Sequence, residues 1–122
     1  MKLIFKTILI VALLQSSVLV EARKLKFNAE VLGTLVQDGA FGDCMVKISP
    51  SPDALGLACS ADYVTLSCSG DLNSKANANA KLASAQLALV TNTYLTVLVV
   101  DGRLHNGYCF ADRVENTNTS VP

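Results

Sequence analysis

The chain has 122 residues with ten basic and ten acidic side chains, so its formal net charge is zero. After the first 22 residues, eight basic residues stand against nine acidic ones, and no basic stripe is present that would neutralise phosphates. This composition argues against nucleic-acid binding. It suits one small domain, residues 23–122, that buries a modest core.

The first 22 residues are typical of a secretory signal peptide. Two lysines give a positive start, and an uninterrupted apolar run follows at residues 8–14. Val20 and Ala22 occupy the small-residue positions that precede a cleavage site, which places the cut between Ala22 and Arg23. Polar residues 15–17 end the apolar run well before the roughly 20 residues that a membrane span needs. We therefore expect a secreted protein, extracellular or periplasmic, without a membrane span.

The mature chain contains four cysteines, which are Cys44, Cys59, Cys68 and Cys109. An even number of cysteines in an exported chain predicts two disulfides, in one of three connectivities. Zinc is the alternative, because His105 lies four residues before Cys109, but no two cysteines have the close spacing of a zinc knuckle. We therefore expect disulfides, with no metal site and no cofactor.

The first half of the mature chain predicts three strands. Residues 25–36 form the first, in which Gly33 indicates a bulge. A turn at 37–43 leads to a short strand at 44–49, and the prolines and glycine that follow predict a loop. Residues 62–68 alternate between apolar and polar side chains and predict the third strand.

The second half predicts a helix and two strands. Ser74 is a suitable N-cap for an alanine-rich helix whose inward face carries Ala78, Leu82, Ala85 and Leu89. Apolar and β-branched residues in the run 93–102 predict a well-covered strand. The segment 101–107 then predicts a turn, residues 107–116 a last strand, and residues 115–122 a flexible polar tail that overlaps its end.

The predicted fold is mainly β with one helix, in the order β-β-β-α-β-β. Five strands with a helix between the third and the fourth are typical of an OB-fold-like barrel, and another small α+β sandwich is the alternative. In such a barrel the second and third strands form a hairpin, and the fifth runs parallel to the third. This arrangement favours the pairs Cys44–Cys68 and Cys59–Cys109. The pairs Cys44–Cys59 and Cys68–Cys109 remain the alternative.

Two short motifs resemble a known family. They are "SAQ" in the predicted helix and "HNG" before the last strand, with a phenylalanine five residues after the histidine. The matching residues are Ser84, Ala85, Gln86, His105, Asn106, Gly107 and Phe110. In these residues the chain resembles the receptor-binding B subunits of the Shiga toxin family, and it also looks similar to small exported gamma-proteobacterial proteins of unassigned role. The resemblance implies a secreted OB-fold, a pentameric ring and binding to host glycolipid sugars.

The chain departs from that family at several positions. Leu104 replaces the family's cysteine before the histidine, and Tyr108 and Cys109 replace the glycines after "HNG". The segment between the two motifs is longer, and the chain has no tryptophan, so one aromatic residue of the family's sugar sites has no counterpart. A common fold is therefore a stronger expectation than a common ligand.

The segment "DGRLHNGY" carries the candidate ligand-binding residues, which are Asp101, Arg103, His105, Asn106 and Tyr108. Planar polar groups beside an aromatic ring match what sugars require, although turn chemistry alone also explains Gly102 and Gly107. Asp101, His105 and Ser67 include the residue types of a triad, but no catalytic motif is present. We therefore expect no enzyme activity.

Two functions follow from these observations. The first is a non-enzymatic module that binds a glycan or cell-surface receptor. The second is a disulfide-stabilised structural or inhibitory domain that binds proteins. Small side chains in the helix, at Ala76, Ala80, Ala83 and Ala88, would let another backbone approach closely. They would suit a homo-oligomer, which by the resemblance would be a pentamer. The alternative is a helix that closes one end of the barrel, with outer alanines that only favour helix formation.

Overall fold

A computed structural model describes residues 21–122, so the predicted signal peptide lies outside the described residues except for Glu21 and Ala22. In chain order the elements are β1 (Lys24–Val36), β2 (Cys44–Ser49), the 3-10 helix η1 (Asp53–Leu55), β3 (Tyr63–Thr65), α1 (Lys75–Thr91), β4 (Thr93–His105) and β5 (Tyr108–Ser120). Strands make up 47% of the described residues. The predicted order of strands and helix is confirmed.

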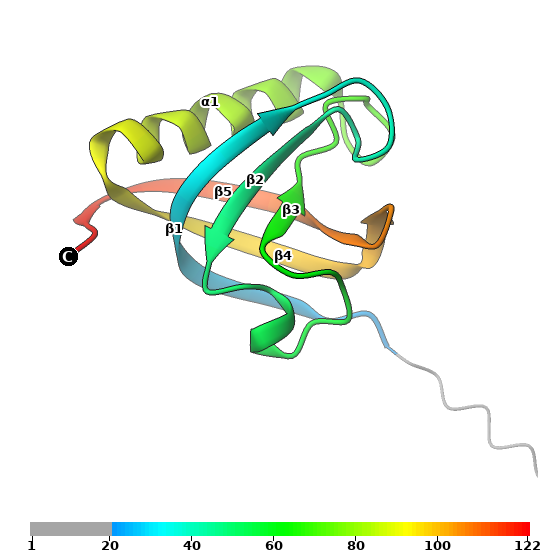
Figure 1. The fold of residues 1–122 in the computed structure, drawn as a ribbon, viewed down its shortest axis with the longest axis horizontal. Coiled ribbons are helices and arrows are strands. Elements are labelled where there is room, and N and C mark those ends of the chain that lie inside the picture. Colours follow the sequence, from blue (N-terminus) through cyan, green and yellow to red (C-terminus); the bar gives the residue numbers. More distant parts are fainter. Residues whose placement is uncertain (1–20) are drawn as a thin grey trace, which may run out of the picture.

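The five strands form one sheet that closes into a ring (Figure 1). The order around the ring is β1, β2, β3, β5 and β4, and β4 pairs with β1 to close it. Neighbouring strands are antiparallel except β3 and β5, which run parallel as predicted, with Thr65 opposite Phe110. A register shift between Val31 and Gly33 confirms the predicted bulge in β1.

Apolar side chains from alternate strand positions fill the inside of the ring. Each of the following is at most 2% exposed: Val46, Ile48, Val64, Leu95, Val97 and Val99. The period of two follows from strand geometry, in which successive side chains point to opposite faces. Burying each such side chain contributes about 1.5–3 kcal/mol, so this cluster is the main source of the domain's stability.

Helix α1 lies across one side of the ring and contacts β1 and β5 most extensively (Figure 1). Ser74 caps it as predicted, because its Oγ accepts a hydrogen bond of 3.1 Å from the backbone N–H three residues later. Ala78, Ala85 and Ala88 are buried on the inward face of α1, so the expectation that Ala88 lies open to another backbone was wrong. The predicted inward face was wrong at Leu89, which is 38% exposed.

Two disulfides connect the ring, Cys44–Cys68 and Cys59–Cys109, which is the pairing that the predicted strand arrangement favoured. Cys44 is the first residue of β2, and Cys68 follows β3. Cys59 precedes β3, and Cys109 lies on β5. Two disulfides are consistent with an oxidising location, extracellular or periplasmic.

The predicted turn at 101–107 was wrong in its extent. Strand β4 continues to His105, and the turn consists of Asn106 and Gly107, with φ angles of 49° and 86°. Positive φ at both residues is typical of a two-residue hairpin. The strand continues because it pairs with the residue before β1. The N–H of Asp101 donates to the backbone oxygen of Arg23 at 3.1 Å.

Two further strand boundaries differ from the prediction. Residues 115–120 belong to β5 rather than to a flexible tail, since Ser120 pairs with Thr93 and the N–H of Val121 donates to the oxygen of Asn92 at 2.9 Å. Strand β3 ends at Thr65, before the predicted end at residue 68. It ends there because Ser67 adopts a φ of 57°, which leaves the extended region.

Candidate functional site

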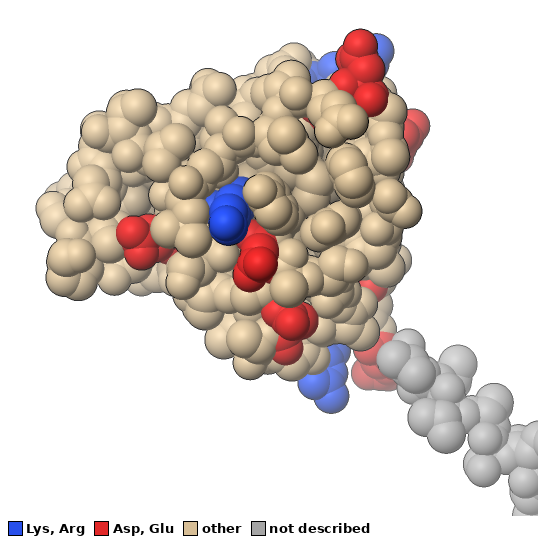
Figure 2. Space-filling model, viewed as in Figure 1, with Lys and Arg blue, Asp and Glu red and all other residues tan. Residues whose placement is uncertain are grey.

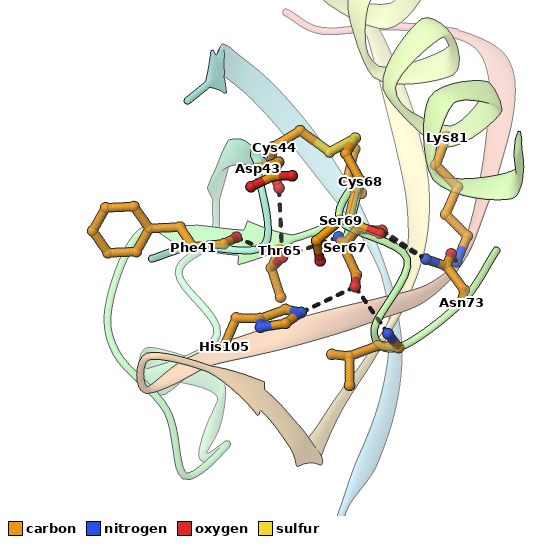
Figure 3. The surroundings of a disulfide bond; sticks show 12 residues. Phe41, Asp43, Cys44, Thr65, Ser67, Cys68, Ser69, Asn73, Lys81 and His105 are labelled. Carbon is orange, nitrogen blue, oxygen red and sulfur yellow. Dashed lines mark hydrogen bonds between the residues drawn. A yellow bond between two sulfur atoms is a disulfide. The ribbon is translucent and has the colours of Figure 1, made fainter. Parts of the chain in front are cut away.

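Three loops meet around His105, and we call this region the three-loop junction. They are the β1–β2 loop (37–43), the β3–α1 loop (66–74) and the β4–β5 hairpin (105–108). The Nε2 of His105 lies 3.0 Å from the Oγ of Ser67 (Figure 3). Gly42 of the first loop packs against the same ring, so that a Cβ at this glycine would lie 2.6 Å from the Cδ2 of His105. His105 therefore fills the space between the other two loops.

Side-chain hydrogen bonds hold the β3–α1 loop in place (Figure 3). The Oγ1 of Thr65 donates to the backbone oxygen of Phe41 at 2.9 Å and accepts from the N–H of Ser67 at 3.0 Å. The Oγ of Ser67 accepts from the N–H of Leu72 at 2.9 Å. The Nδ2 of Asn73 donates to the backbone oxygen of Ser67 at 3.2 Å. These contacts fix Ser67 in its left-handed backbone conformation.

The triad considered from the sequence is not formed. Asp101 lies away from His105, and its carboxylate accepts from the N–H of Arg23 at 2.6 Å and from the N–H of Ala58 at 3.1 Å. These hydrogen bonds, that of Arg23 first, hold the pKa of Asp101 below its ordinary value. Asp101 therefore anchors the start of β1 and the segment after η1.

Ser67 and His105 do meet, but their surroundings differ from those of a nucleophile and base. The nearest carboxylate is that of the exposed Asp71, whose Oδ2 lies 4.0 Å from Nε2, the nitrogen that also contacts Ser67. In a triad, the orienting carboxylate binds the other ring nitrogen. Ser67 is fully buried and already accepts a backbone hydrogen bond. The pair therefore connects two loops as a structural contact.

Three half-buried aromatic rings form a cluster beside this junction. Tyr108 lies at the centre, with its ring centroid 5.5 Å from that of Phe41 and 6.2 Å from that of Tyr63. The interplanar angles are 82° and 88°, so both pairs are edge to face, an arrangement that aromatic quadrupoles favour. We call Phe41, Tyr63 and Tyr108 the aromatic cluster. Each of the three residues is partly exposed to solvent.

Asn106 projects next to this cluster from the hairpin turn. Its side chain is exposed, and its neighbours His105 and Tyr108 pair across the hairpin. A left-handed φ of 49° is one that asparagine tolerates better than most residues. The hairpin therefore presents one amide and one tyrosine ring at the same end of the molecule.

Arg103 makes its contacts outside the aromatic cluster. Its guanidinium lies 4.9 Å from the ring centroid of Phe110, and it donates to the backbone oxygen of Leu72. This contact joins β4 to the β3–α1 loop. A cation over a ring face contributes about 0.5–2 kcal/mol.

Lys81 of α1 contacts the same phenylalanine. Its Nζ lies 4.6 Å from the Phe110 centroid and donates to the Oδ1 of Asn73 at 2.9 Å and to the oxygen of Ala111 at 3.0 Å. Burial lowers the pKa of Lys81; the negative charge of Asp112 partly opposes this, and the nearby Arg103 adds to it.

The predicted site residues therefore separate into two groups. His105, Asn106 and Tyr108 lie together in the hairpin, while Asp101 and Arg103 make other contacts. Sequence reasoning missed Phe41 and Tyr63. The available signal for Phe41 was a large aromatic residue within the polar turn 37–43, where no core position was expected.

Comparisons of the chain with family models, with curated proteins and with solved structures find no match. The face seen in Figure 2 carries scattered basic and acidic groups among uncharged side chains, without a patch of one sign. Among residues 21–122, no helix has the length and apolar content needed to span a membrane. The candidate site is therefore assigned from the contacts and exposure of its own residues.

Proposed function

We propose that this protein is an exported, non-enzymatic module that binds sugars at the aromatic cluster. The observation that carries the proposal is the set of three half-exposed rings around Tyr108, with the exposed amide of Asn106 beside them. Sugars present C–H-rich faces that pack against aromatic rings, and their hydroxyls bond to planar amides. The aromatic rings and the Asn106 amide both lie at this end of the molecule.

The fold supports this choice of site if the closed ring is an OB-fold, which is also part of the proposal. The order of the elements, the ring order and the parallel β3–β5 pair agree with that architecture. OB-folds bind oligosaccharides on the face of strands 2 and 3 and at the loops that join strands 1–2 and 4–5. Phe41 comes from the first of these loops, Tyr63 from β3, and Tyr108 from beside the second loop.

Export and the sugar ligand have separate support from the sequence. The features of residues 1–22 resemble a signal peptide, and both disulfides suit an oxidising compartment. The "SAQ" and "HNG" motifs resemble those of the Shiga toxin B subunits, which bind host glycolipid sugars. A host-surface glycan is therefore the ligand class that we propose.

A second copy of the chain is the partner that α1 favours. Its outward face carries an apolar stripe with alternating spacings of four and three residues, made of Ala76, Ala80, Ala83, Leu87 and Val90. Val90 is 79% exposed and Leu87 is 51% exposed. A four-three repeat is the pattern by which helices pack against each other. Self-association would place several sugar sites on one particle and raise the avidity for a cell surface.

Glycan binding is tested with the folded, oxidised protein on a glycan array, followed by calorimetry on any hit. Tyr63→Ala is expected to weaken binding at least tenfold, because it removes one ring face. Asn106→Gly keeps the positive φ of the turn and removes the amide, so binding is expected to fall while the unfolding midpoint stays nearly unchanged. Tyr94→Ala, at the far end of β4, is the matched control and is expected to bind as the parent does.

No binding to any glycan by the folded protein would contradict the proposed function. The second candidate, a domain that binds a protein partner, is favoured by the α1 stripe. Light scattering after size-exclusion chromatography tests self-association. Val90→Lys is expected to give a monomer, and Asn77→Lys, whose exposed residue lies off the stripe, is expected to leave the oligomer intact. A parent protein that is monomeric at micromolar concentration would refute self-association.

A further inference from the structure

The backbone nitrogen of Arg23 lies directly against a carboxylate. It donates to the Oδ1 of Asp101 at 2.6 Å, and the N–H of Asp101 donates back to the oxygen of Arg23 at 3.1 Å. The Oδ2 of Asp101 accepts from the N–H of Ala58 at 3.1 Å. This one side chain therefore connects the residue before β1, strand β4 and the segment after η1. None of these residues belongs to the aromatic cluster.

A bulge of three residues in β4 allows this contact. Val100 pairs with Phe110 and Leu104 pairs with Cys109, so the three residues between Val100 and Leu104 have no partner on β5. The bulge directs Asp101 toward the start of β1. The pKa of Asp101 lies below its ordinary value because Arg23 and then Ala58 donate to it, so the carboxylate is ionised at neutral pH.

The predicted cleavage site falls at this same nitrogen. We propose that removal of residues 1–22 converts the Arg23 N–H into an α-ammonium that forms an ion pair with Asp101, and that this pair completes the mature fold. The inference rests on the export part of the proposed function. Water hydrolyses the peptide bond: the carbonyl of Ala22 becomes a carboxylate and departs, and the nitrogen of Arg23 gains two protons.

The change strengthens a contact that is already in place. A hydrogen bond between an ammonium and a carboxylate is roughly twice as strong as one with a neutral partner. Cleavage also removes Ala22, which packs closely against Gly102. The approach is so close that a Cβ added at Gly102 would lie 2.5 Å from the Cβ of Ala22. The product is a terminus that is held in place by its own new charge.

Other charged groups face this position as well. Lys24, Arg103 and Asp112 line a pocket of about 170 Å³ together with Ala22, Val100 and Gly102. The guanidinium of Arg23 reaches the oxygen of Gly56 at 3.5 Å. The cations lower the pKa of a terminal ammonium and Asp112 raises it, while Asp101 is in hydrogen-bond contact. We therefore expect the effect of Asp101 to dominate.

The test compares the chain that begins at Arg23 with the same chain acetylated at its N-terminus. In the folded free-amine form, NMR titration is expected to place the pKa of the α-amino group at about 9, above its ordinary value of about 7.7–8.0. Because the folded pKa is raised, the stabilisation is complete below about pH 7 and is lost as the pH rises toward 10. The acetylated chain is expected to lack this loss.

Asp101→Asn should return the pKa of the α-amino group to its ordinary value, and Asp112→Asn should change it much less. The acetylated chain keeps Asp101, so it serves as the test if Asp101→Asn does not fold. An ordinary α-amino pKa in the folded parent chain would overturn the proposal. So would a secreted protein whose N-terminus, determined by mass spectrometry, is a residue other than Arg23. Glycan binding by the same sample is a separate measurement. Failure of the proposed sugar binding can therefore be distinguished from failure of the proposed ion pair.

Discussion

The Oγ of Ser67 and the Nε2 of His105 lie 3.0 Å apart and join two loops that are 38 residues apart in the chain. Ser67→Ala is expected to destabilise the protein by about 1–3 kcal/mol, because the N–H of Leu72 also loses its acceptor. His105→Ala is expected to cost about 1–2 kcal/mol. In urea unfolding, the double variant should show a coupling of about 0.5–1.5 kcal/mol.

Ser69→Ala is the control for this pair. Its hydroxyl donates to Asp71 at an exposed position, so the free energy of unfolding should change by less than about 0.5 kcal/mol. A coupling near zero between Ser67 and His105 would mean that the hydrogen bond contributes nothing to stability.

Gly42 is expected to be far less tolerant of substitution than Gly39, although both have positive φ angles, 73° and 109°. Gly39→Ala meets no atom within 4 Å and should cost about 1–2 kcal/mol from backbone strain alone. Gly42→Ala would bring a Cβ within 2.7 Å of both His105 and Thr65, so a further 1–3 kcal/mol, roughly, is expected from overpacking. Thermal unfolding of the two variants measures the difference, and equal midpoints would contradict the close packing at the junction.

The disulfide that closes the longer loop should stabilise more. Cys59–Cys109 spans 50 residues and Cys44–Cys68 spans 24. Loop-closure entropy predicts about 4 kcal/mol for the first and about 3.5 kcal/mol for the second. Paired cysteine-to-alanine variants, unfolded in urea without reductant, give the two values. Peptide mapping without reduction should recover these same pairs, and a Cys44–Cys59 peptide would refute the connectivity.

Lys81 should give the protein a rise in stability at alkaline pH. Its pKa is lowered in the folded protein, first by burial, so between that pKa and the ordinary value of 10.5 the unfolded chain binds more protons. The free energy of unfolding contributed by this residue therefore increases as the pH rises toward 10.5. Comparison with Lys81→Met between pH 8 and pH 10.5 isolates the effect. A constant difference between the two proteins would mean that the pKa of Lys81 is not lowered.

Much of the fold could be predicted because its signals are local. Alternating or continuous runs of apolar residues located the strands, Ser74 located the start of α1, and Gly33 located the bulge. The disulfide pairing followed from the order of strands around the ring, which requires Cys44 to lie near Cys68. In each case a few neighbouring residues, or the topology alone, determine the result.

The boundaries that failed depend on distant partners. The sequence from Asp101 to Arg103 has the composition of a turn, but hydrogen bonds between Asp101 and Arg23 keep it in the strand. The residues after Asn116 are polar, yet pairing with the start of β4 extends β5 to Ser120. Composition cannot indicate such pairings, because they form between segments far apart in the chain.

The candidate site was predicted in part for the same reason. His105, Asn106 and Tyr108 are neighbours in the chain, so their common location could be inferred. Phe41 and Tyr63 lie beside Tyr108 only because the closed sheet brings β3 and the β1–β2 loop to the hairpin. A cluster assembled from three separate segments leaves no contiguous motif.

The pairing between β3 and β5 is short, and one of the two disulfides, Cys59–Cys109, bridges it. Strand β3 has three residues, Cys59 and Cys68 stand on either side of it, and Cys59 bonds directly to β5. If reduction released this pairing, the ring would become an open sheet with two unpaired edges, and such edges recruit strands from other molecules. Oxidation is therefore expected to protect this protein against aggregation as well as against unfolding.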